Sequence, residues 1–131
     1  MLRNKTIIGL ILTGVSVLLW SGCYKDKTVL FDTGEEITRT VLFSADIIPI
    51  LNQSCNTSGC HNAGGISPDL SATNAYSSLS AGNYFNTGNP ASSELYLWMT
   101  GKKGLSMPTS GVNKDYNALI LAWIKQGAQN N

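Results

Sequence analysis

The chain has 131 residues, which is enough for one domain and short for two. Its formal net charge is +1, and only 13% of its residues are charged. Nucleic-acid binding is therefore not expected, because it needs a clustered basic surface and the nearest candidate is the pair Lys102 and Lys103.

The first 22 residues have the pattern of an export signal. Arg3 and Lys5 precede an apolar run, TIIGLILTGVSVLLW, and small residues follow it. A basic start, a short apolar segment and a small-residue exit are typical of a secretory signal peptide, and the run is shorter than a membrane-spanning helix needs. We therefore expect residues 1–22 to be removed on export.

The exit from this run, LLWSGC, resembles the lipobox of bacterial lipoproteins. In those proteins a peptidase cuts before the cysteine, whose thiol then receives lipid, so Cys23 is the predicted lipidation site. Acyl chains contribute about 0.8 kcal/mol of membrane binding per buried methylene, and several of them would anchor the chain without a spanning helix. Residues 23–42 are polar and mixed in charge, which is typical of a tether between lipid and domain.

Residues 43–131 are predicted to form one all-α domain, because four stretches carry helical signals and no stretch alternates like a strand. The four stretches are FSADIIPILNQSC, DLSATNAYSSL, SSELYLWM and NKDYNALILAWIKQG. Their expected N-cap residues are Ser44, Ser71, Ser92 or Ser93, and Asn113. In the first stretch, Pro49 marks either the start of the helix or a kink.

The last stretch carries the clearest helical signal. Asp115 falls in its first turn and Gly127 follows its last. Apolar residues recur at i, i+3, i+4, i+7 and i+8, at Tyr116, Leu119, Ile120, Trp123 and Ile124. Long glycine-rich loops separate the four stretches, and in so small a domain such loops need something to pack on, such as a large apolar cofactor.

Two of the three cysteines and the only histidine stand together in SCNTSGCHN. Because an exported chain meets an oxidising compartment, Cys55 and Cys60 could form a disulfide, which leaves His61 without a role. A structural zinc site needs four ligands, so a carboxylate would have to be the fourth, and adjacent residues such as Cys60 and His61 fit one tetrahedral ion poorly. A nucleophilic Cys–His pair usually meets through the fold rather than along the chain, and leaves the second cysteine unexplained.

A c-type haem uses all three residues. Two cysteines form thioether bonds to the haem, and the histidine directly after the second one ligates the iron, usually in the spacing C-x-x-C-H. Here four residues separate Cys55 from Cys60, and Gly59 eases the bulge that this spacing requires. A second axial ligand is often methionine. Met107, in a loop before a proline, is the candidate, whereas Met99 lies in an apolar helix and is expected in the core.

Several segments in order resemble the small monohaem cytochrome c domain of many Bacteroidetes- and Planctomycete-type lipoproteins. They are IIPILNQSCNTSGCHN, DLSATNAYSSL, GNPASSELYLWM, MPTSG and ILAWIKQGAQNN, and they cover about residues 44–131. The resemblance implies a cytochrome c-like fold of about four short helices around one covalent haem c. It also implies that Cys55 and Cys60 hold the haem, with His61 as proximal and Met107 as distal ligand. The four-residue spacing departs from the usual motif and is an accepted variant of this kind of domain.

The expected function is electron transfer rather than catalysis, since two filled axial positions leave no iron site for a substrate. The apolar side chains expected to wall the haem are Leu70, Tyr76, Leu79, Leu95 and Trp98. A backbone carbonyl near Pro68 is expected to accept a hydrogen bond from His61 Nδ1. The expected partners are redox proteins of the periplasm or membrane. The alternative is a non-haem exported interaction module with a Cys55–Cys60 disulfide.

Overall fold

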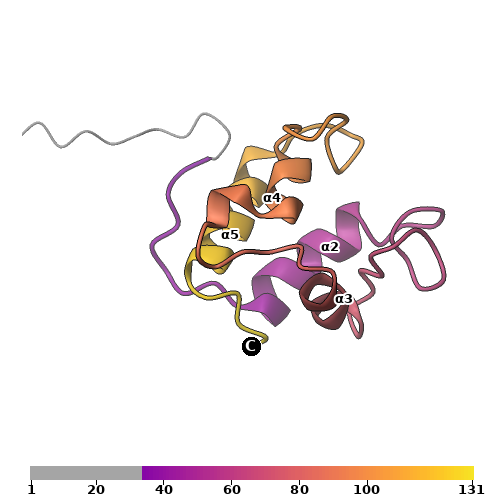
Figure 1. The fold of residues 1–131 in the computed structure, drawn as a ribbon, viewed down its shortest axis with the longest axis horizontal. Helices are drawn as coiled ribbons and strands as arrows, with labels where there is room; N and C mark the ends of the chain where they lie inside the picture. The colour runs from indigo at the N-terminus through magenta and orange to yellow at the C-terminus, as the bar shows by residue number, and fades with distance from the viewer. Residues whose placement is uncertain (1–33) are drawn as a thin grey trace, which may run out of the picture.

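The computed structural model describes residues 34–131, so the expected signal peptide, Cys23 and the first part of the tether lie outside the described residues. Within that range the structure is all-α, as predicted, and contains no strand. The elements are a π-helical turn η1 (Phe43–Ile47), α2 (Ile48–Ser54), α3 (Ala75–Ala81), a 3-10 turn η2 (Pro90–Ser92), α4 (Glu94–Met99) and α5 (Lys114–Lys125) (Figure 1). None of the helices in this range is long and apolar enough to cross a membrane.

Helix α5 forms where the sequence predicts it. The side chain of Asn113 accepts hydrogen bonds from the amides of Asp115 and Tyr116, which are among the donors that a helix start leaves without partners. The helix ends at Lys125, and Gly127 follows with φ of +97°, a conformation that glycine adopts without strain. Seven of the twelve helical residues are buried, so α5 is the central element of the domain.

The first helical segment begins differently from the prediction. Ser44 does not cap it; the chain enters from Leu42 through the π-turn η1, and α2 follows without interruption. The carboxylate of Asp46 accepts a hydrogen bond from the Leu42 amide at 2.8 Å, and it also binds Arg39. Pro49 is the second residue of α2, in the first turn of the α-helical part, where proline is tolerated.

Helices α3 and α4 are shorter than their sequence patterns. Ser71 precedes a turn rather than a helix, because the Asp69 carboxylate accepts hydrogen bonds from the Ser71 amide and from the Asn74 side chain. Helix α3 therefore begins at Ala75. Ser93 is the N-cap position of α4, as one of two predicted, but its hydroxyl accepts a hydrogen bond from the Asn86 amide instead of capping the helix.

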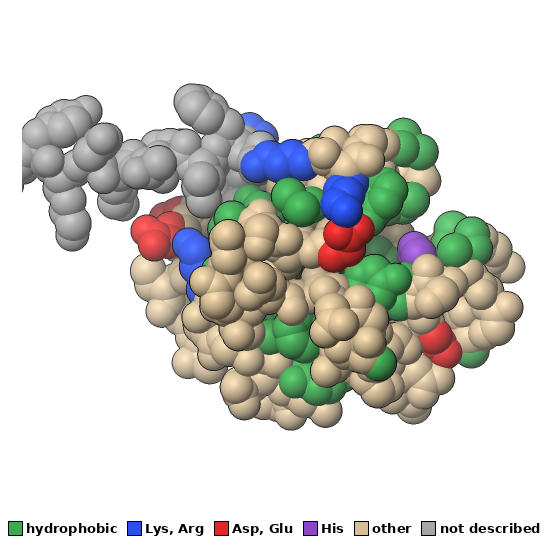
Figure 2. All heavy atoms as spheres, viewed as in Figure 1, with side chains coloured by type: hydrophobic (Ala, Val, Ile, Leu, Met, Phe, Trp, Pro, Cys, Tyr) green, Lys and Arg blue, Asp and Glu red, His purple; other side chains and the backbone are tan. Residues whose placement is uncertain are grey.

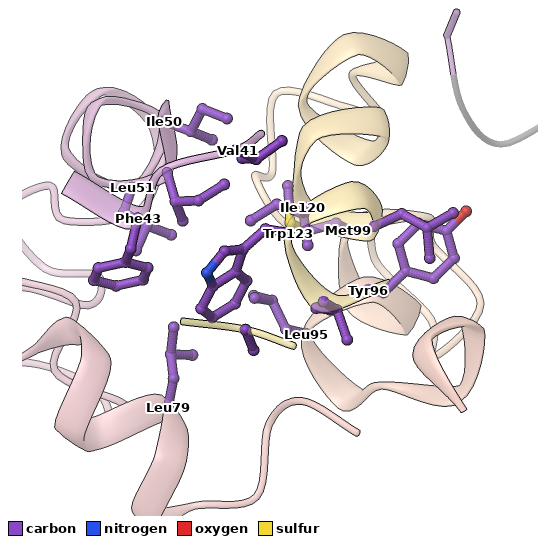
Figure 3. Packing of buried hydrophobic residues seen from close by; sticks show 14 of the residues in the cluster. Val41, Phe43, Ile50, Leu51, Leu79, Leu95, Tyr96, Met99, Ile120 and Trp123 are labelled. Atoms are coloured by element: carbon purple, nitrogen blue, oxygen red, sulfur yellow. The ribbon is translucent and has the colours of Figure 1, made fainter. Parts of the chain in front are cut away.

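The core is built around Trp123, whose ring lies among side chains from every helix (Figure 3). The rings of Phe43 and Phe85 each lie 5.2 Å from it between centroids, and that of Tyr76 lies at 6.5 Å, within the range of favourable aromatic pairs. The indole Nε1 donates to the Gln129 carbonyl at 2.9 Å. The surrounding buried aliphatic residues include Ile47, Leu51, Leu79, Ile120 and Ile124.

The segment before η1 lies along α5. The Gly34 amide donates to the Lys114 carbonyl at the start of that helix. At its other end the side chain of Gln126 accepts from the Val41 amide and donates to the Arg39 carbonyl, both at less than 3.0 Å. Val41 is buried. The C-terminal part of the expected tether is thus bound to the domain, which continues N-terminal of residue 43.

Candidate functional site

Cys55 ends the first helical segment. It follows Ser54, the last residue of α2, and its amide donates to the Leu51 carbonyl at 2.9 Å. The side chain is buried, with 7% of its surface exposed. Burial, and then the nearby Cys60, raise the pKa of the Cys55 thiol to about 11. The helix therefore holds this sulfur as a neutral thiol at the edge of the core.

The bulge that the sequence requires between the two cysteines is a tight turn. The Cys60 amide donates to the Thr57 carbonyl at 2.9 Å, and Gly59 has φ of +79°, which favours glycine. The turn returns the chain to the helix end, where the His61 amide donates to the Cys55 carbonyl at 3.1 Å. Both cysteines are free thiols. The longer spacing thus still brings the histidine back beside the first cysteine.

The ring of His61 is oriented by a backbone carbonyl. Its Nδ1 lies 3.0 Å from the carbonyl oxygen of Ile66, two residues before Pro68, close to the place that the sequence suggested. The loop is held on both sides of the ring, since the Ile66 amide donates to the Cys60 carbonyl and the Leu70 amide donates to the His61 carbonyl, each at 2.7 Å. When Nδ1 carries the proton, the lone pair of the ring lies on Nε2. This tautomer can bind a metal through Nε2.

Gly65 shows how closely this loop is wound. A Cβ added there would collide with the Cys60 carbonyl oxygen and with the side chain of Asn62. Position 65 therefore needs glycine because other atoms approach its Cα closely, and not because of its backbone dihedral angles. Any larger residue would have to move the backbone that carries Cys60 and His61.

Met107 and Met99 occupy different environments. Met99 is 2% exposed and belongs to the core, which confirms the prediction for it. Met107 is half-buried in the loop after α4, and its amide donates to the Trp98 carbonyl at 3.0 Å. Met107, unlike Met99, therefore lies outside the core.

Hydrophobic side chains surround the single histidine at the surface. Figure 2 shows it in a recess with hydrophobic atoms beside, above and below it. Viewed as in Figure 1, the recess lies between the loop after α2 and the loop before α5. The large hydrophobic side chains most exposed in the described range are Ile66 at 64%, Leu105 at 67% and Val112 at 48%, and all three belong to these two loops. Large exposed apolar patches typically mark binding sites, and hydrophobic atoms adjoin the histidine in Figure 2.

The expected haem wall divides into two groups. Leu70, Leu79 and Leu95 are buried in the domain's own core. Tyr76 and Trp98 are half-buried, and the Tyr76 hydroxyl donates to the Ala128 carbonyl at 3.0 Å. The three leucines therefore pack in the core of the domain, whereas the two aromatic residues are only partly buried.

A cavity of about 410 Å³ lies away from the cysteines and histidine. It opens between the segment before η1 and the end of the chain, and no thiol or imidazole lines it. Its lining residues are Thr38, Thr40, Val41, Trp123, Gln126, Gln129 and Asn131. This cavity could not be predicted, because its walls come from residues 38–41 and 123–131, which are far apart in the sequence.

Residues 34–131 contain no group of three or more histidine, cysteine or acidic side chains that could hold a metal ion. A haem iron with one histidine and one methionine ligand would not form such a group. The donor types fit a covalent haem: two free thiols close in sequence, an imidazole with Nδ1 engaged and a half-buried methionine outside the core. No protein-family model, curated protein or solved structure matches this chain.

Proposed function

We propose that this protein is a membrane-anchored monohaem c-type cytochrome that transfers electrons through one covalently bound haem c. The observation that carries the proposal is the local arrangement at the end of α2. Two free thiols flank a glycine turn, and the following His61 has its Nδ1 bound to the Ile66 carbonyl. Such a ring is held in one orientation before any metal arrives.

Each of the four site residues has a role in this proposal. Cys55 and Cys60 would hold the haem through thioether bonds, and His61 Nε2 and Met107 would be the two iron ligands. When bound, the haem supplies a one-electron iron couple. The chain contributes a fixed imidazole, a methionine on a loop tied to α4, and apolar side chains that exclude water.

Electron transfer is preferred to catalysis because both axial positions are filled in this arrangement. The finer fold that we propose is cytochrome c-like, with the all-α domain placing the haem between the loop after α2 and the loop before α5. The exposed apolar residues of those loops, Ile66, Leu105 and Val112, support a haem site there, since a bound porphyrin would cover part of them.

The anchor and location complete the proposal. Cys23 is the proposed lipidated residue, which would hold the domain on a bacterial membrane facing the periplasm or the cell surface. The partners are then redox proteins of the periplasm or membrane. No nucleic acid is involved, in keeping with the low charge of the chain.

One experiment tests the proposal. The full chain is expressed and exported together with a cytochrome c maturation system, then denatured and examined by mass spectrometry and by its optical spectrum. A mass increase of one haem that survives denaturation, with a c-type reduced spectrum, is the expected result. A colourless protein lighter by two hydrogens would instead mean a Cys55–Cys60 disulfide, and the proposal would be abandoned for a non-haem interaction module.

A further inference from the structure

Glu94 lies at the start of α4 and binds two partners at once. Its Oε1 accepts a hydrogen bond from the indole Nε1 of Trp98 at 2.8 Å, one helical turn later on the same face. Its Oε2 lies 2.6 Å from Nζ of Lys103, which belongs to the loop after the helix. The carboxylate therefore joins the helix to the loop that carries Met107.

Trp98 connects this contact to the methionine. Its side chain is held by Glu94, and its backbone carbonyl accepts hydrogen bonds from the amide of Met107 at 3.0 Å and from that of Gly101 at 3.1 Å. At the helix end the amides of Gly101 and Lys102 donate to the Trp98 and Leu97 carbonyls. Beyond them, Lys103 and Met107 connect the loop to α4.

None of the residues from 100 to 112 is buried, and Gly101 and Gly104 both have positive φ, at +74° and +131°. A loop without buried side chains opens at low free-energy cost, so its few ties to the helix determine where its side chains lie.

We propose that Glu94 is a positioning residue for Met107: by holding Trp98 and Lys103 together it fixes the loop that presents the methionine to the haem iron. This inference rests on the proposed function, since it takes Met107 as the axial ligand. Glu94 itself touches neither haem nor iron in this role.

The test measures how readily Met107 leaves the iron. The ferric holoprotein is mixed with imidazole, and the loss of the long-wavelength iron–sulfur absorption gives the rate of methionine displacement. Glu94→Gln keeps an oxygen that can accept from the Trp98 indole but removes the ion pair with Lys103. We expect methionine displacement to become about three- to five-fold faster, which corresponds to the free energy that one well-aligned surface ion pair contributes. Lys103→Met should give the same change, and the double variant no more than either single one.

The matched control is a second ion pair on another part of the molecule. Arg39 and Asp46 form a bidentate pair at 2.7 and 3.0 Å, and Asp46→Asn removes it. This variant should leave the displacement rate unchanged. A second readout is hydrogen exchange of the Met107 amide in the holoprotein, which should accelerate in Glu94→Gln and not in Asp46→Asn.

The outcomes separate this inference from the proposed function. An iron–sulfur band in the wild type with equal rates in Glu94→Gln and Asp46→Asn would overturn the positioning role and leave the cytochrome intact. A covalent haem that lacks the band in the wild type would remove Met107 as ligand, and the inference with it. Absence of haem would overturn both.

Discussion

The helices of this domain, here called the body, and its two site loops, residues 56–67 and 100–112, are stabilised in different ways. In α5, seven of twelve residues are buried, whereas none is buried in residues 56–67 or 100–112, which carry Cys60, His61 and Met107. The body is fixed by apolar packing around Trp123, and the loops are fixed by backbone hydrogen bonds and glycine turns. Cys60, His61 and Met107 therefore lie outside the core, whereas Cys55 belongs to it. A ligand held between the loops would add packing that they lack.

The largest effect should come from the body. Trp123→Ala removes the ring at the centre of the core and should lower the free energy of unfolding by about 3–5 kcal/mol. Ile66→Ala in the site loop removes a side chain that is 64% exposed and should change it by about 0.5 kcal/mol or less. Urea unfolding followed by circular dichroism measures both. Equal losses would mean that the loops and the body share one core.

The two methionines offer a sharper version of the same comparison. Met99→Ala should cost about 2–4 kcal/mol of stability, because Met99 is 2% exposed, and should leave the haem spectrum of the holoprotein unchanged. Met107→Ala should have the opposite pattern, with the iron–sulfur absorption lost and little change in unfolding of the haem-free chain. Thermal unfolding and the ferric spectrum of each variant are the measurements. An altered spectrum in Met99→Ala alone would exchange the roles of the two residues.

The same division explains what could be predicted from the sequence. The Asn113 cap and the apolar face of α5 are local patterns, and the structure confirms both. The all-α class follows from the same periodicity. The start of the first helix was predicted wrongly, because Arg39 and Leu42 both bind Asp46 and the chain enters through a π-turn that Ser44 does not cap.

The site was only partly predictable. Adjacent cysteines and histidine can be read from the sequence, and so can the surface position of Met107 next to a proline. The Glu94–Lys103 ion pair was not predicted, and for His61 a carbonyl near Pro68 was expected but Ile66 itself was not identified. Each contact depends on how a glycine-rich loop folds back. The signal for the ion pair was weak: an acidic residue at the start of α4 and a basic residue in the loop after it.

The two thiols should differ in reactivity before haem is attached. The Cys55 thiol is buried and has its pKa raised to about 11, whereas Cys60 is half-exposed on the turn. At pH 8 we expect iodoacetamide to modify Cys60 at least about ten-fold faster than Cys55 in the reduced, haem-free chain, because the thiolate is the nucleophile. Peptide mass spectrometry after timed quenching gives both rates. The difference should vanish in guanidinium chloride; if it is already absent in the native chain, Cys55 is not held in the body.

The smallest expected effect is a pH dependence that compares one ion pair from each region. The pKa of Asp46 is lowered mainly by the hydrogen bond from Arg39, and that of Glu94 mainly by the hydrogen bond from Lys103. A carboxyl whose pKa is lowered on folding stabilises the fold at pH values above its pKa in the unfolded chain, about 4. This contribution is lost as the pH falls through the lowered pKa of the folded state. Stability measured between pH 6 and 2 should therefore decline on acidification, and less steeply in Asp46→Asn and in Glu94→Gln than in the wild type.

The readout distinguishes the two regions. Asp46 holds the entry to the first helix, so its substitution should alter global unfolding. Glu94 holds the Met107 loop, so its substitution should alter mainly the hydrogen exchange of amides in residues 100–108. If acid changed the exchange of both regions together in every variant, the domain would open as one unit. The loops would then belong to the body, and the independence inferred from their lack of buried residues would be wrong.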